Sequence, residues 1–288
     1  MNKFYIQIVL FLLSIFIYVN NKTLATDPAP EGNTKTKAKE KTKAKEKTKN
    51  KSKNTYPTPE DIFEKNKKLL CTNPEETKQA VKLMGEAIMH LVYHATNEDG
   101  SEPSKSDTGT SSLSYKKKHE KPADILKNNC RLYDFGLYNV LVRMIWDPEH
   151  INFPIDDSTI YSKKKITRKV VRVYNPNLII IQQRYKDSIF SCWKYFYALV
   201  KKSQISEDKT IIVMASVNIN DQYPSDKEYK NTIIENANLF KTDIESEDDI
   251  KQGKLKKVVV NIAGYFIQKI EKHIHITYIE SINEEDST

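Results

Sequence analysis

The residue types that could carry chemistry in this sequence assemble into no familiar catalytic or metal-binding pattern. His90 and His94 stand four residues apart on one predicted helix, which is the spacing of a metal pair. No glutamate completes HExxH and no third ligand is near, so we expect structural histidines. Ser, His and Asp residues also occur without a spacing that would join a nucleophile, a base and an orienting group. The sequence therefore predicts a protein that is not an enzyme, with no catalytic residue, no metal and no cofactor.

The glycines and cysteines of the sequence exclude further classes of protein. The seven glycines form no GxGxxG, GxxxxGK[ST] or GxSxG motif, which disfavours nucleotide-dependent enzymes and α/β-hydrolases. Cys71, Cys130 and Cys192 are odd in number and widely spaced, so they indicate neither a disulfide framework nor a CxxC site. We expect buried free cysteines, and one disulfide with a leftover thiol is the alternative in an oxidising compartment.

Residues 1–25 have the pattern of a secretory signal peptide. Lys3 supplies the positive start, Ile6–Val19 is an apolar run with two polar interruptions, and Ala25 is a small residue suited to cleavage. The run has about 14 residues, fewer than the ~20 that a transmembrane helix needs. A retained signal anchor is the alternative. No later segment is apolar enough to span a bilayer, so we expect a soluble mature protein that enters the secretory pathway.

Residues 26–56 form a predicted linker that carries the positive charge of the chain. Ten lysines occupy every odd position of Lys35–Lys53, with only Glu40 and Glu46 against them, and this accounts for the whole formal charge of +8. No apolar residue larger than alanine occurs in Lys35–Lys53, so burial cannot offset the entropy of ordering and we expect a disordered tether. Attraction to an anionic membrane surface, at about 1 kcal/mol per lysine, is the alternative to a simple spacer. The balanced remainder argues against a nucleic-acid partner.

Residues 57–288 predict one α+β domain. Thr58-Pro59 and Asn73-Pro74 are helix starts, each with a capping residue, a proline and following acids. The second helix runs from Pro74 to about Ala95, and a short amphipathic helix covers Tyr138–Trp146. Between them, Asn97–Ser112 is expected to be a mobile loop. The apolar positions of the long helix are spaced by three and four residues: Ala80, Val81, Met84, Ala87, Ile88, Leu91 and Ala95.

Strands dominate the second half of the domain. Two short strands are predicted around Leu113–Lys117 and Cys130–Phe135, before the β-rich runs. Those runs are Ile166–Tyr174, Leu178–Tyr185, Cys192–Lys201, Thr210–Ile219, Lys256–Gln268 and His273–Ile282. Short connections favour an antiparallel meander. Bulky groups gather on one face: Trp193, Tyr195, Tyr197 and Leu199 in one run, and Ile211, Val213, Ala215, Val217 and Ile219 in the next. A curved sheet with such a face could leave an apolar tunnel, and a filled core is the alternative.

Almost the whole chain closely resembles the fam-a family, an expanded multigene family of Plasmodium malaria parasites that is best known in rodent species. The resemblance rests on the signal peptide, the Lys-rich tether and several strings that agree in order. These strings are Tyr56-Pro-Thr-Pro-Glu60, Leu70-Cys-Thr-Asn-Pro-Glu75, Trp146-Asp-Pro-Glu-His150, Val171-Arg-Val-Tyr-Asn-Pro-Asn-Leu178, Lys194-Tyr-Phe-Tyr-Ala-Leu199 and Thr232-Ile-Ile-Glu235.

The resemblance implies a StAR-related lipid-transfer (START) domain. This is a helix-grip fold in which a curved antiparallel sheet wraps a long carboxy-terminal helix and encloses one lipid. Lys209–Val217 is similar to the START strand that ends in Ser-Val, and His275–Ile282 is similar to the last strand. The implied activity is binding and moving phospholipid, phosphatidylcholine in particular. The implied destination of the exported protein is the parasitophorous vacuole or the host cell.

Three features depart from the START pattern. Lys194 and Tyr195 stand where Arg-Asp is usual, and Asn283 follows the final predicted strand where Asp is usual. The sequence also reaches Thr288 where the carboxy-terminal helix should begin. We expect the helix from Pro74 to cover the sheet in its place, or a truncated and weakly functional member.

A phospholipid ligand would need a cation and hydrogen-bond donors for its phosphate. Arg143 and Arg184 are the candidates, with plain surface charge as the alternative for each. Trp193, Phe196 and Tyr197 are candidate lining residues, with ordinary core as the alternative. The rival function is that of a host-facing interaction protein or antigen whose START scaffold no longer carries lipid.

Overall fold

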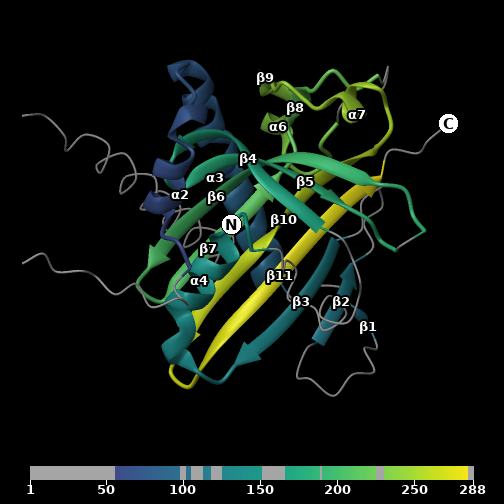
Figure 1. Ribbon diagram of the computed structural model, residues 1–288. Helices are drawn as coiled ribbons and strands as arrows, with labels where there is room; N and C mark the ends of the chain where they lie inside the picture. The colour runs from purple at the N-terminus through teal and green to yellow at the C-terminus, as the bar shows by residue number, and fades with distance from the viewer. Residues whose placement is uncertain are drawn as a thin grey trace, which may run out of the picture. The chain divides into compact units, whose positions relative to one another are not determined.

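The computed structural model describes residues 56–97, 102–104, 113–117, 125–150, 166–188, 190–224 and 230–284 (Figure 1). They belong to one compact unit, Asn54–Thr288. The predicted signal peptide at residues 1–25 lies outside the described residues, as does nearly all of the linker at residues 26–56. Among the helices of the described part, none is long and apolar enough to cross a membrane.

Both predicted helix starts are confirmed. Helix α2 (Pro59–Lys65) begins after Thr58, whose hydroxyl accepts the Asp61 N–H at 3.1 Å while the Asp61 carboxylate accepts the Thr58 N–H at 3.0 Å. Helix α3 (Pro74–Thr96) begins after Asn73, whose side-chain oxygen accepts two N–H groups of the first turn. These caps satisfy donors that have no partner inside the helix, so the local sequence alone fixes both starts.

The remaining helices are short. Helix α4 (Tyr138–Trp146) matches its predicted bounds. The residues of its predicted apolar face are all buried: Tyr138, Leu141, Val142, Ile145 and Trp146. A 3₁₀ turn precedes it, η2 (Phe135–Leu137), and another, η1 (Lys67–Leu69), follows α2. Helices α6 (Glu235–Leu239) and α7 (Asp248–Lys251) belong to the segment between β8 and β10.

A nine-stranded sheet forms the body of the described domain. Its order is β1-β2-β3-β11-β10-β7-β6-β5-β4, and neighbours in this order are antiparallel. The predicted meander is confirmed in β4 through β7. The strands are β1 (Glu102–Ser104), β2 (Leu113–Lys117), β3 (Ile125–Leu132), β4 (Ile166–Asn175), β5 (Leu178–Tyr185), β6 (Lys194–Ser206), β7 (Lys209–Ala215), β10 (Lys256–Ile270) and β11 (His273–Glu284). A separate parallel pair joins β8 (Asn218–Asn220) to β9 (Lys241–Asp243).

Several predicted boundaries are wrong. Strand β3 begins at Ile125, because it pairs along its length with β11, and Phe135 belongs to η2 instead. Strand β1 lies within the range expected to be a loop. The run predicted as Thr210–Ile219 is broken at Ser216, whose hydroxyl bonds the Tyr197 carbonyl at 2.8 Å and the Val260 N–H at 3.0 Å. The chain therefore leaves β7 and continues in β8.

The end of β11 and the cysteines also differ from expectation. Asn283 lies inside β11, paired with Val259, and does not follow the strand. Cys71, Cys130 and Cys192 are free thiols, but none is fully buried, and Cys192 is exposed because it lies in the loop before β6.

The sheet is covered by helices on both faces, which we call the α3 side and the α4 side. The α3 side buries one set of alternate strand residues against the long helix: Ile180, Tyr195, Tyr197, Leu199, Ile211, Val213, Ala215 and Phe266. The α4 side buries the other set against α2 and α4: Ile181, Phe196, Ile212, Met214, Tyr265, Ile274, Ile276 and Tyr278. In Figure 1 the edge strand β4 and its neighbour β5 cross the direction of β10 and β11, as in a strongly twisted sheet.

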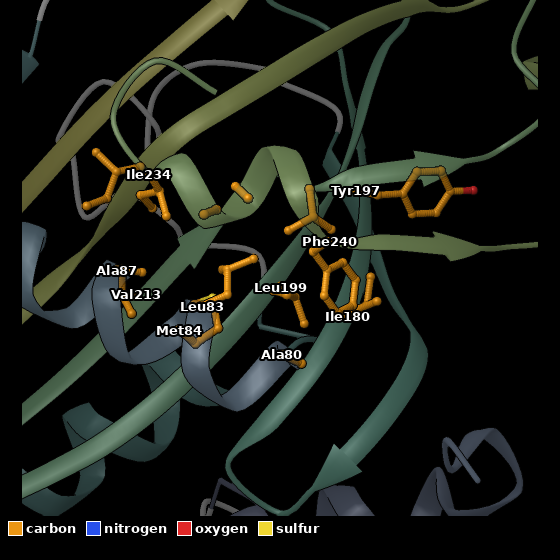
Figure 2. Close-up of a cluster of buried hydrophobic side chains, with 14 of the residues drawn as sticks. Ala80, Leu83, Met84, Ala87, Ile180, Tyr197, Leu199, Val213, Ile234 and Phe240 are labelled. Atoms are coloured by element: carbon orange, nitrogen blue, oxygen red, sulfur yellow. The ribbon is translucent and has the colours of Figure 1, made fainter. Parts of the chain in front are cut away.

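The α3 side is a filled core. Figure 2 shows Leu83 and Met84 of α3 directed toward Leu199 and Phe240, and Leu83 rising toward α6. Leu83 and Met84 have exposed fractions of 1% and 0%. Leu83 lies outside the predicted stripe but is buried, because α6 packs beside α3. Val81 and Ile88 of the predicted stripe are only half-buried. The helix from Pro74 covers this face of the sheet, and its buried side chains pack against β7 and β10.

Candidate functional site

The α4 side places polar groups inside an apolar layer. Its described helices, α2 and α4, have 7 and 9 residues, against 23 in α3 on the other side. Asp147-Pro148 ends α4, since proline cannot continue the hydrogen-bond ladder. The end of α4 therefore carries Trp146, Asp147 and the following His150 to the same side of the sheet.

Arg168 and Gln183 form the polar centre of this side. Arg168 of β4 lies directly opposite Gln183 of β5, which in turn lies opposite Phe196 of β6. Direct cross-strand partners share one face, so the three side chains form a row on the α4 side. The Arg168 Nε donates to Gln183 Oε1 at 2.9 Å, and its Nη2 donates to the same oxygen at 2.5 Å. A neutral amide thus orients the guanidinium.

Burial governs the electrostatics of Arg168. By its exposed area the residue is half-buried. Burial of the guanidinium nevertheless lowers its pKa to about 10, against the raising effects of Tyr265, Tyr278 and Asp147. The side chain still carries a positive charge at neutral pH. In the sheet order, three strands separate β4 from β10. The electrostatic influence of Tyr265 and Tyr278 on Arg168 therefore requires a sheet curved enough for its β4 edge to face β10 and β11.

The two tyrosines are themselves buried together. Their ring centroids lie 4.8 Å apart, and the Tyr278 hydroxyl donates to Glu280 Oε2 at 2.6 Å. Burial, followed by Glu280, raises the pKa of Tyr278 well above its usual value. The Tyr278 phenol is therefore neutral near pH 7 and contributes polarity to this layer without adding charge.

Two buried nitrogen atoms near the end of α4 have no hydrogen-bond partner within the described ranges of the chain. They are Nε1 of Trp146, a residue only 3% exposed, and Nε2 of His150. The His150 ring packs edge-on against Tyr56 at 5.0 Å. A buried N–H without an acceptor costs about 1–3 kcal/mol, so native proteins nearly always satisfy it by protein, water or ligand. The Trp146 indole is accordingly a donor available to a ligand atom on the α4 side.

Arg184, predicted as a phosphate ligand, lies on the α3 side. Its Nη1 donates to Asp249 Oδ2 at 2.8 Å, and its Nη2 donates to Asp249 Oδ1 at 3.0 Å and to Glu247 Oε2 at 2.8 Å. Two carboxylates thus occupy the guanidinium. Although burial opposes the shift, hydrogen bonds from Lys169 and Gln182 lower the pKa of Glu247 to about 2. In the structure these bonds hold the segment around α7 to the sheet, and a phosphate ligand at Arg184 stays a prediction.

The other predicted site residues are divided between the two sides. Tyr197 lies in the filled α3 side, where its hydroxyl bonds Gln182 at 2.6 Å and Ser246 at 2.7 Å, and burial raises its pKa to about 12. Trp193 packs against the same cluster, with Lys186 Nζ 5.4 Å from its ring centroid. Phe196 lies on the α4 side. The three therefore do not line one cavity, because neighbours in a strand point to opposite faces.

Arg143 lies on α4, half-buried, and its charge contributes to a lowered pKa of Lys202 after burial and the opposing effect of Glu60. Within the described residues, its guanidinium has no hydrogen bond or ion pair. Of the two histidines spaced like a metal pair, His90 lies beside an acid of its own helix, with its Nε2 3.8 Å from Glu86 Oε1. No group of three metal-ligating side chains occurs among the residues that the structure describes.

Sequence reasoning missed Arg168, Gln183 and Trp146. One signal was available, because Arg168 alternates with the apolar Val170 at a distance of two residues and so shares its face. The signal for Trp146 was its place on the predicted apolar face of α4. Neither signal indicates which side of the sheet is filled by a long helix, which is what separates the two sets of candidates.

The comparisons with known proteins find likeness in fold only. No protein-family model and no curated protein matches the chain. Among solved structures, human StAR-related lipid transfer protein 5 is 10% identical with a TM-score of 0.48 and covers 74% of this chain and 86% of its own. Human STARD10 is 13% identical with a TM-score of 0.46, covering 69% and 67%. The lipid transfer and protein localization domain of human StarD13 is 14% identical with a TM-score of 0.41, covering 70% and 84%.

These TM-scores lie below 0.5, so the likeness identifies no ligand for this chain. The fold itself defines the class of the protein. It is an α+β domain whose curved antiparallel sheet is covered by helices on both faces, with a cationic group inside one apolar side.

Proposed function

We propose that the chain is a non-enzymatic lipid-binding protein whose ligand is a phospholipid, of the phosphatidylcholine type, held on the α4 side of the sheet. The observation that carries the proposal is the buried indole N–H of Trp146, which finds no acceptor among the residues that the structure describes and lies in an apolar layer. Arg168, oriented by Gln183, supplies a desolvated cation in the same layer. The sequence resemblance to the START-bearing fam-a family supports the same reading.

Binding needs no covalent chemistry. Acyl chains leave water at a gain of about 0.8 kcal/mol per buried CH₂, which favours an apolar wall such as that of the α4 side. A phosphate that leaves water must recover its hydrogen bonds from donors or cations. Trp146 and Arg168 are suited to this role, and Phe196, next to Gln183 in the row, is suited to contact the chains near the headgroup.

The test is a mass spectrum of the organic extract of the purified protein, together with exchange of labelled phosphatidylcholine between vesicles. We expect one co-purifying phospholipid per chain. Trp146→Phe keeps an aromatic side chain, with a smaller ring, and removes the N–H. It should lower bound lipid about tenfold, the effect of a hydrogen bond to a charged group worth roughly 1.5 kcal/mol. Trp193→Phe is the matched control, because the second tryptophan packs on the α3 side.

A second function is favoured by the filled α3 side. A START-like scaffold that no longer carries lipid would serve as a host-facing interaction protein or antigen, and its interior would be packed throughout. The same experiment separates the two functions. Absence of co-purifying phospholipid together with absence of exchange would exclude the first and leave the second.

We further propose that the protein belongs to the fam-a family and is secreted and exported toward the vacuole or the host cell. The signal-peptide pattern at residues 1–25 and the lysine-rich residues 26–56 support this destination. Imaging of a tagged chain in infected cells tests it. Signal beyond the parasite boundary is expected, and retention in the parasite's own secretory compartments would contradict export.

A further inference from the structure

One end of the described domain exposes a group of large apolar side chains. We call it the hairpin-end surface, because it lies beside the turn between β10 and β11. Its members and their exposed fractions are Tyr133 (68%), Phe135 (51%), Leu137 (41%), Val140 (45%) and Ile270 (41%). Figure 1 shows this turn at the lower left, next to the segment that joins β3 to α4. Exposed apolar residues gathered in one place mark an interaction surface more often than isolated ones do.

Contacts between separate segments hold this surface in shape. The Tyr138 hydroxyl donates to Thr210 Oγ1 at 2.9 Å, which ties the start of α4 to β7. Lys269 N–H donates to the Asp208 carbonyl at 2.8 Å, and its Nζ lies 5.7 Å from the ring centroid of Phe135. These contacts join α4, β7, β10 and the turn between β6 and β7. The apolar side chains are therefore presented by a fixed platform.

Ring contacts add a second tie. Tyr133 packs beside His273 of β11 with ring centroids 6.0 Å apart. The strands beneath are paired almost to their ends, with Ile270 opposite His273 and Ser206 opposite Lys209. Within the described strands, this end therefore offers no length of unpaired backbone on which an extended peptide could add a strand.

Charges of both signs surround the apolar group. The exposed cations are Arg131, Lys209, Lys269 and Lys272, and the exposed acids are Asp134, Glu207, Asp208 and Glu271. The mixture is neutral overall, so it complements a zwitterionic surface that presents phosphate and choline groups together. It does not favour a strongly anionic partner. Aromatic rings with polar neighbours are also the side chains that settle at the interface between lipid and water.

We propose that the hairpin-end surface docks the protein on a phospholipid bilayer of zwitterionic type. The inference rests on the proposed function, since a lipid carrier has to contact the bilayer that it loads from. Phe135, Tyr133 and Ile270 enter the interfacial region, and the surrounding cations and acids pair with phosphate and choline. Because apolar insertion carries the contact, docking depends little on salt.

The test is co-sedimentation of the full chain with phosphatidylcholine vesicles at low and high salt. The double variant Tyr133→Ser, Phe135→Ser should lower vesicle partition about tenfold, equivalent to about 1.4 kcal/mol, with an unchanged circular-dichroism melting curve. Leu239→Ser is the matched control, because Leu239 is 76% exposed on α6, outside this surface. It should partition like the parent chain.

Several results would overturn the proposal. Equal partition of the double variant and the parent would exclude the surface, and so would a shift from dimer to monomer in the variant, which would assign the surface to a second copy. If Phe190→Ser, in the loop between β5 and β6, alone abolishes partition, docking lies elsewhere. Extracted lipid separates this failure from that of the proposed function: a variant that keeps its lipid but no longer docks supports both, whereas a parent chain that docks without lipid supports the surface only.

Discussion

Replacing Arg184 by methionine should destabilise the fold and leave lipid binding unchanged. Arg184 was a candidate phosphate ligand by residue type, but the structure gives its guanidinium three hydrogen bonds to Glu247 and Asp249. Methionine keeps most of the apolar stem and removes the charge. The substitution therefore separates a structural ion pair from a ligand contact.

The size of the effect follows from exposure. The Arg184 side chain is 20% exposed, and the carboxylates of Glu247 and Asp249 are 40% and 39% exposed. A fully exposed ion pair contributes at most ~1 kcal/mol to the stability of a fold, whereas removing one partner of a buried ion pair costs roughly 3–5 kcal/mol. Two partly exposed partners place this cluster near the lower value. We expect a loss of about 1.5 kcal/mol, which lowers the melting temperature by about 3–6 °C for a domain of this size.

The assay combines thermal unfolding with extraction of bound lipid. We expect the melting temperature of Arg184→Met to fall by about that amount, with lipid content equal to that of the parent chain. Unchanged stability with lost lipid would refute the assignment of Arg184 to the α3 side and restore it as a headgroup ligand. Arg168→Met is the contrasting variant and should lose lipid.

Three further predictions concern a tightly packed glycine, an acidic side chain and the lysine-rich segment. Gly264→Ala should destabilise by about 1–3 kcal/mol in urea unfolding, because a Cβ there would lie 2.3 Å from the Ile212 carbonyl, whereas Gly85→Ala, with nothing within 4 Å, should stabilise. Burial raises the pKa of Glu247, but hydrogen bonds from Lys169 and Gln182 hold that pKa at about 2. The ionised carboxylate therefore stabilises the fold above the ordinary pKa of 4.5, and this contribution is lost as the pH falls toward 2. Glu247→Gln should accordingly make the stability of the fold depend less on pH in this range, as measured by urea unfolding at several pH values. Deleting Lys35–Lys53 should reduce adherence to anionic vesicles at low salt and leave lipid content unchanged; unchanged adherence would make the segment a spacer only.

Local sequence was sufficient where the structure depends on local chemistry. The caps of α2 and α3 and the bounds of α4 and β5 follow from capping residues, proline and apolar spacing, and all agree with the structure. The alternation of Tyr195 and Tyr197 against Phe196 also predicted which residues share a face. What alternation does not state is which face receives a long helix and becomes a filled core.

The candidate site depended on contacts between distant segments. Arg184 is occupied because the segment that carries Glu247 and Asp249 returns to the sheet more than sixty positions later in the chain, and no local pattern announces this. Arg168 is desolvated because the curved sheet brings β10 and β11 toward the β4 edge. Residue type made arginine the candidate for a phosphate ligand, while tertiary structure decided which arginine lies in an apolar layer.

The most direct test of lipid binding on the α4 side is to follow the indole N–H signals of the protein in a ¹H–¹⁵N spectrum. The chain has two tryptophans, so Trp146→Phe and Trp193→Phe assign both signals. Delipidation followed by reloading with phosphatidylcholine should move the Trp146 signal, as its N–H loses and regains an acceptor, and leave that of Trp193 in place. A Trp146 signal that is unaffected by lipid, or a change confined to Trp193, would contradict the account.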